Sequence, residues 1–108
     1  MNLLFICSRN KWRSPTAEKI FNSQHYKTKS AGTEESARIK VNQKHVNWAD
    51  IIFVMEKRHK QRLSEKFNEL LTGKTLIVLD IPDQYQFMDE ELIELLKVSV
   101  EPYLEKYN

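Results

Sequence analysis

A cysteine and an arginine near the start of the chain have the types and the spacing that phosphate chemistry needs. Cys7 follows the apolar run 3–6, which is typical of a buried strand, and Arg13 precedes a sequence that favours a helix. A thiolate between a strand and a helix is stabilised by the helix N-terminus and by a nearby guanidinium. Backbone N–H groups of such a loop also form an anion site. The pattern predicts a nucleophile beside a cradle for phosphoryl oxygens.

The side chains at the end of this loop fit the same chemistry. Arg13 can offer two parallel donors to phosphoryl oxygens, which a lysine cannot match. Ser14 can donate a hydrogen bond to the sulfur of Cys7 and so favour the thiolate. A purely structural interpretation remains open, in which Cys7 is a small buried hydrophobic residue and Arg13 lies on the surface.

Length and composition predict one globular domain, spanning residues 1–108. The net charge of +2 is too small for a typical nucleic-acid-binding protein. The one basic cluster, 57–62, is predicted to be an exposed helix start, with a docking patch for an acidic partner as the alternative. No apolar stretch approaches the roughly 20 residues of a membrane helix, and no secretory signal is evident. We expect a cytoplasmic protein without membrane partners.

The rest of the chain alternates between strand and helix patterns, which predicts an α/β fold with a parallel sheet and helices on both faces. Strands are predicted at 2–6, 26–30, 50–55 and 75–79, and helices at 14–23 with Ser14 as N-cap, at 36–47, at 56–71, and after Asp89 as N-cap. Ligands bind at the carboxyl ends of such strands. Cys7, Met55 and the segment 80–83 should meet at that edge.

Four segments, in order, resemble the low-molecular-weight protein tyrosine phosphatases: 7–18, 30–33, 49–56 and 80–85. The segment from Cys7 to Glu18 carries the most specific match, because it includes Arg13-Ser-Pro-Thr-Ala-Glu. The resemblance implies a single-domain α/β fold with four parallel strands in the order 2-1-3-4. It also implies a cysteine-dependent phosphomonoester hydrolase, specifically a protein tyrosine phosphatase, without metal or cofactor.

The resemblance assigns catalytic roles to three residues. Cys7 would be the nucleophile that forms a phosphocysteine, and Arg13 would clamp the phosphate. Asp83 would be the general acid and base, because the family's acid precedes a Pro-Tyr pair that is Gln84-Tyr85 here. Asp80 is the alternative acid, or else a turn residue at the end of a strand.

Further residues would shape the site. Ser14 would stabilise the thiolate, and Asn10 would hold the loop through hydrogen bonds to Ser30. Trp12 and Tyr85 would form walls for a phenyl ring. The phosphate-binding loop itself would consist of Ser8, Arg9, Asn10, Lys11, Trp12 and Arg13.

The chain departs from the family pattern at three places. Arg9 replaces a usual glycine, so the loop is strained if its backbone needs a positive φ there, or the extra cation selects a more anionic ligand. Trp12 replaces a second cysteine, so the family's loop disulfide cannot form. The chain is also shorter than typical members, mostly between Thr33 and Trp48, where the family walls its site.

Other aromatic and ionisable residues receive plainer interpretations. Phe87 and Trp48 are expected to pack in the core. His25, His45 and His59 are expected to be surface residues, because no pair has the spacing of metal ligands on a helix.

The expected partners are a phosphorylated protein or small phosphomonoester as substrate, and inorganic phosphate as product and inhibitor. Two alternatives to catalysis of this kind remain. One is a phosphate- or phosphoprotein-binding module that keeps the cradle without turnover. The other is arsenate reduction, which normally needs further cysteines, whereas Cys7 is the only cysteine in this chain.

Overall fold

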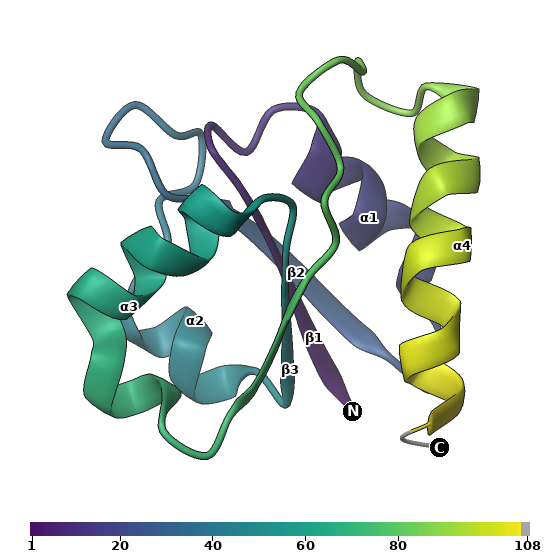
Figure 1. The fold of residues 1–108 in the computed structure, drawn as a ribbon. Helices are drawn as coiled ribbons and strands as arrows, with labels where there is room; N and C mark the ends of the chain where they lie inside the picture. The colour runs from purple at the N-terminus through teal and green to yellow at the C-terminus, as the bar shows by residue number, and fades with distance from the viewer. Residues whose placement is uncertain (107–108) are drawn as a thin grey trace.

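A parallel four-stranded sheet forms the centre of the molecule in the computed structural model, which describes residues 1–106 (Figure 1). Its strands lie in the order β2-β1-β3-β4, as predicted. In chain order the elements are β1 (Asn2–Cys7), α1 (Arg13–Phe21), β2 (Lys27–Gly32), α2 (Gln43–Trp48), β3 (Ile51–Val54), α3 (Lys57–Leu71), β4 (Thr75–Val78) and α4 (Glu90–Lys106). The α/β class and the helices on both faces are confirmed.

Alternate residues of β1 supply two separate cores, because successive side chains of a strand point to opposite faces. Leu3 and Phe5 pack with α1 and α4, while Leu4 and Ile6 pack with α2 and α3. Figure 1 shows α1 and α4 on one side of the sheet and α2 and α3 on the other. A strand buried on both faces explains the apolar run that lacks polar alternation. This packing holds the carboxyl end of β1, and therefore Cys7, in a rigid frame.

The predicted helix at 36–47 is mostly absent. Only α2, at Gln43–Trp48, is helical there, and the segment before it forms turns. The N–H groups of Glu34 and Arg38 donate to backbone carbonyls of residues 8 and 9. Because these donors serve another segment, they are not available for a helical ladder. The thin apolar stripe of 36–47 gave little packing to oppose this.

The predicted cap of α1 is also wrong, whereas that of α4 is confirmed. The helix begins at Arg13, one residue before Ser14, and Trp12 is its N-cap without a side-chain hydrogen bond. Ser14 is buried in the first turn, where its hydroxyl meets other side chains. Asp89 caps α4, since its Oδ1 accepts the backbone N–H of Glu91 at 2.8 Å. No helix within residues 1–106 has both the length and the apolar composition that crossing a bilayer requires.

Candidate functional site

The loop between β1 and α1 is held from outside by its carbonyl groups. Four consecutive carbonyls, of residues 7–10, accept hydrogen bonds from the segment 33–38. The bonds, each 3.0 Å long, are Thr33 N–H to Cys7 O, Glu34 N–H to Ser8 O, Arg38 N–H to Arg9 O and Arg38 Nε–H to Asn10 O. By contrast, the N–H groups of residues 8–12 make no hydrogen bond within the described chain. The loop therefore keeps its donors free for an anion.

The loop turns at Asn10 rather than at Arg9. Asn10 has a φ of 56°, in the left-handed region that asparagine tolerates better than most residues. Arg9 is not among the positive-φ residues of the described chain, so it is free of the strain considered for it. Gly32 lets the loop approach β2, because a Cβ atom there would lie 2.6 Å from the carbonyl oxygen of Ser8.

A buried chain of hydrogen bonds leads to the sulfur of Cys7. The hydroxyl of Ser30 donates its proton to the carboxylate of Glu18. Because that proton is used, the Ser30 oxygen acts as the acceptor for Asn10 Nδ2, at 2.9 Å. The same Asn10 amide donates to Ser14 Oγ at 2.8 Å. Ser14 Oγ lies 2.9 Å from Cys7 Sγ but 3.5 Å from its other acceptor, the carbonyl of residue 31. The network thus directs the Ser14 proton toward the sulfur.

The side chain of Arg13 is buried, with only 2% of it exposed, and three contacts fix its position. Its Nη1 donates to Glu56 Oε2 at 2.5 Å and to the carbonyl of Ile81 at 2.8 Å. Its Nε lies 3.7 Å from Asp83 Oδ1. Burial of a guanidinium is costly unless it is paired, and these contacts supply the pairing. The guanidinium is therefore held by residues of the two segments that follow β3 and β4.

Glu56 is a site residue for which sequence reasoning assigned no role. Partial burial acts to raise its pKa, but the hydrogen bonds from Arg13 and Arg58 outweigh it and hold the pKa of Glu56 below its ordinary value. Glu56 therefore stays a carboxylate beside Arg13. The signal for it was its position two residues after the end of the buried strand β3, at the carboxyl edge of the sheet.

His59 was expected on the surface, and the structure shows that this is wrong. It is buried in the first turn of α3, with Nε2 2.8 Å from Ser8 Oγ. Its Nδ1 accepts the backbone N–H of Glu56 at 3.0 Å, so Nε2 carries the proton and donates to Ser8. Burial, together with the charges of Arg13 and Arg58, lowers the pKa of His59 to about 4 despite the opposing effect of Glu56. The neutral ring braces the loop from outside.

A small cavity of about 90 Å³ lies beside the loop, at the carboxyl edge of the sheet. Its lining consists of Cys7, Ser8, Arg9, Lys11, Trp12, Arg13 and Asp83. Cys7 is 3% exposed, and Trp12, 44% exposed, stands at the rim. Asp83 lines the cavity, whereas Asp80 does not. Because Cys7 lines the cavity, a small group that enters it can reach the sulfur.

The remaining aromatic residues lie outside this cavity. Tyr85 packs against the core formed with α1 and α4 and is not part of the cavity lining. Trp48 packs against the other core, as expected. Phe87 is 46% exposed, so its expected place in the core is wrong. Residues 1–106 contain no cluster of three or more His, Cys, Asp or Glu side chains suited to a metal ion.

Part of the chain matches a known protein family. Residues 2–42, which include the whole loop, match the sequence profile of the family described as low molecular weight phosphotyrosine protein phosphatase. No curated protein matches the chain.

Solved structures resemble the whole chain. The tyrosine phosphatase Wzb from Escherichia coli K30 in complex with phosphate is 25% identical, with 99% of this chain and 98% of that one covered and a TM-score of 0.74. YwlE arginine phosphatase from Geobacillus stearothermophilus is 20% identical, with coverage of 99% and 97% and a TM-score of 0.69. SP-PTP, a low molecular weight protein tyrosine phosphatase from Streptococcus pyogenes, is 19% identical, with coverage of 97% and 91% and a TM-score of 0.78. The fold is therefore shared across nearly the full length.

Proposed function

We propose that the chain is a cysteine-based phosphatase of the low-molecular-weight phosphatase family and that it hydrolyses phosphotyrosine-type aryl phosphates through Cys7. The observation that carries this proposal is the contact of Ser14 Oγ with Cys7 Sγ at 2.9 Å, beside a loop with free N–H groups. A hydroxyl donor stabilises a thiolate, and the N–H groups with Arg13 complement the charge of a transferring phosphoryl group.

In the first step, the Cys7 thiolate attacks phosphorus and the bond from phosphorus to the tyrosine oxygen breaks. Asp83 enters as the carboxylic acid and gives its proton to the departing oxygen. The amides of the loop and the guanidinium of Arg13 hold the other three oxygens throughout. Asp83 lies on the cavity wall within 3.7 Å of Arg13, which favours it over Asp80 for this role.

In the second step, a water molecule attacks the phosphocysteine. Asp83, now a carboxylate, takes a proton from this water, and the sulfur–phosphorus bond breaks. The electron pair returns to Cys7 as a thiolate, which accepts the hydrogen bond of Ser14. Inorganic phosphate leaves, and the protein is restored without a metal or cofactor taking part in either step.

The charges around the cavity favour an aryl phosphate over a phosphorylated guanidine. Arg9 and Lys11 line the cavity beside Cys7 and attract a phosphate dianion. The same cations repel the guanidinium that leaves phosphoarginine. Trp12 at the rim offers an aromatic surface to a phenyl ring. Phosphoarginine is the second candidate, because YwlE from G. stearothermophilus, which shares the fold, is described as an arginine phosphatase.

The test compares turnover of a phosphotyrosine peptide, para-nitrophenyl phosphate and phosphoarginine under one set of conditions. We expect the two aryl phosphates to be hydrolysed with the higher kcat/KM. A higher value for phosphoarginine would replace the proposed substrate class. Phosphate binding by calorimetry without hydrolysis of any of the three would favour a binding module instead.

Two variants test the residue roles. Cys7→Ser should abolish turnover while phosphate binding, measured by calorimetry, persists. Asp83→Asn should slow para-nitrophenyl phosphate hydrolysis about 10²–10⁴-fold, the usual scale of general acid catalysis. Asp80→Asn, on the same loop but outside the cavity, is the matched control and should remain near the wild-type rate. Retained turnover in Cys7→Ser would refute the mechanism.

A further inference from the structure

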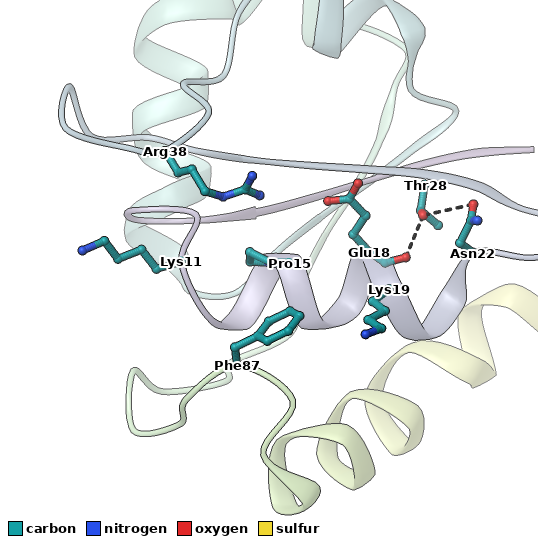
Figure 2. Close-up of a pocket in the computed structure, with 8 residues that line it drawn as sticks. All are labelled: Lys11, Pro15, Glu18, Lys19, Asn22, Thr28, Arg38 and Phe87. Carbon is teal, nitrogen blue, oxygen red and sulfur yellow. Dashed lines mark hydrogen bonds between the residues drawn. The ribbon is translucent and has the colours of Figure 1, made fainter.

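A second and larger cavity adjoins the phosphate-binding loop. It has a volume of about 600 Å³ and lies along α1, with walls from β2, the segment before α2 and the loop before α4. Lys11 lines both this cavity and the one at Cys7, so the two are neighbours. Figure 2 shows Lys11 at one end and Thr28 and Asn22 at the other, with Phe87 extending from the opposite loop. A substrate held at Cys7 therefore has open space beside it.

Positive charge dominates the lining of this cavity. Lys11, Lys19 and Arg38 all contribute to it, and none of them forms an ion pair within the described residues. Arg38 is held in place by its Nε–H bond to the carbonyl of Asn10, and its guanidinium extends toward Glu18 in Figure 2. Glu18 is the one carboxylate in the lining, and it accepts the hydroxyl of Ser30.

The cavity lining combines positive charge with apolar surface, and this combination indicates what kind of group it binds. Lys19 Nζ lies 5.7 Å from the centroid of the Phe87 ring, but none of the three cations has a carboxylate partner among the described residues, so they attract anions. Pro15 and the half-exposed ring of Phe87 provide apolar walls for an aliphatic stem. A glutamate or aspartate side chain combines a short apolar stem with a carboxylate. An extended peptide advances about 3.3 Å per residue, so residues two or three positions from the phosphorylated one reach past the loop.

We propose that this cavity binds acidic side chains that flank the phosphorylated residue of a protein substrate. The inference rests on the proposed function, since it requires a phosphopeptide at Cys7. It assigns Lys11, Lys19 and Arg38 to substrate selection, in addition to the phosphate contacts of the loop. The enzyme is thereby selective for phosphotyrosine within acidic sequence, not for phosphotyrosine alone.

The experiment measures kcat/KM for two phosphotyrosine peptides that differ only in flanking residues, Asp and Glu in one and Asn and Gln in the other. The ratio of the two values is compared in the wild type, in Lys19→Glu and in Lys44→Glu. Lys19 lies in the cavity lining on α1, whereas Lys44 lies on α2, over the other face of the sheet. Both variants change the net charge equally, so they separate the cavity from the overall field. Para-nitrophenyl phosphate, which has no flanking residues, is measured alongside.

We expect the wild type to prefer the acidic peptide about three- to tenfold, the effect of two exposed ion pairs. Lys19→Glu should bring the ratio to about one or below, and Lys44→Glu should keep it at the wild-type value. A wild-type ratio of one, or an equal drop in both variants, overturns the inference. Failure of the proposed function is a separate result, because para-nitrophenyl phosphate would then not be hydrolysed.

Discussion

Replacement of His59 by glutamine tests whether a buried neutral histidine, hydrogen-bonded to Ser8, makes the stability of the fold depend on pH. Glutamine keeps an acceptor for the backbone N–H of Glu56, since it is a normal partner in a capping box, but it does not titrate. The variant therefore removes the proton equilibrium while retaining much of the local hydrogen bonding.

The expected magnitude follows from the shifted pKa. The pKa of His59 falls from its ordinary value of 6.5 to about 4 because of burial and the charges of Arg13 and Arg58, with Glu56 opposing. The unfolded chain therefore binds a proton at a higher pH than the folded one. The stabilisation is complete above pH 6.5 and is lost as the pH falls toward 4. At about 1.36 kcal/mol per pH unit, the loss between pH 7 and pH 5 is about 2 kcal/mol.

The assay is urea unfolding at several pH values from 7 to 5, for the wild type and for His59→Gln. This range ends above the pH at which Glu56, whose pKa is lowered, begins to contribute. His45→Gln is the matched control, because His45 occupies the same capping-box position in α2 and is less buried. The pKa of His45 is also lowered, by burial and by the charge of Lys29. The His45→Gln variant should therefore remove only a small part of the dependence of the free energy of unfolding on pH.

A wild-type free energy of unfolding that falls no faster than that of His59→Gln between pH 7 and pH 5 would refute this reasoning. So would an equal effect of His45→Gln, because the cause would then be the capping histidine in general and not the burial beneath Ser8.

Three further changes test other parts of the frame. Gly32→Ala places a Cβ atom 2.6 Å from the carbonyl of Ser8, so unfolding by urea should show a loss of about 1–3 kcal/mol and calorimetry a weaker affinity for phosphate. Glu56→Gln removes the charged partner of Arg13, and steady-state kinetics should show kcat/KM lower by about 10–100-fold. Leu96→Ala opens a cavity between α4 and the sheet, and urea unfolding should show a loss of about 2–5 kcal/mol with wild-type KM for para-nitrophenyl phosphate.

The frame of the fold was predictable because each central strand carries its own local signal. The apolar residues of β1 and β3 have no polar alternation, and only strands covered on both faces can bury such runs. Parallel strands joined by helices place their carboxyl ends at one edge. This rule predicts the approach of Cys7 to the segment containing Asp83. The strand arrangement could be predicted because the local sequence pattern of each strand agrees with its place in the sheet.

Three of the failed expectations share one cause, which is competition from hydrogen-bond partners outside the predicted element. Residues 36–42 had enough helical character to suggest a helix, but donors in and just before this segment satisfy the loop carbonyls. Ser14 resembled an N-cap, but its hydroxyl is committed to Cys7 and Asn10. His59 resembled a surface residue within a basic cluster, yet its ring reaches Ser8, 51 positions away in sequence. Local propensity contains no information about such partners.

The amino-acid sequence by itself determined the chemistry available here: a thiol at a strand end, a guanidinium at a helix start, and the parallel sheet that presents both. Only the tertiary structure decided how that chemistry is prepared. It turned four loop carbonyls outward and left the amides free, set Glu56 against Arg13, and placed a basic cavity beside the loop. The physical reason is that most buried donors and acceptors of a folded chain find partners, and across a compact domain many of those partners come from segments far apart in the chain.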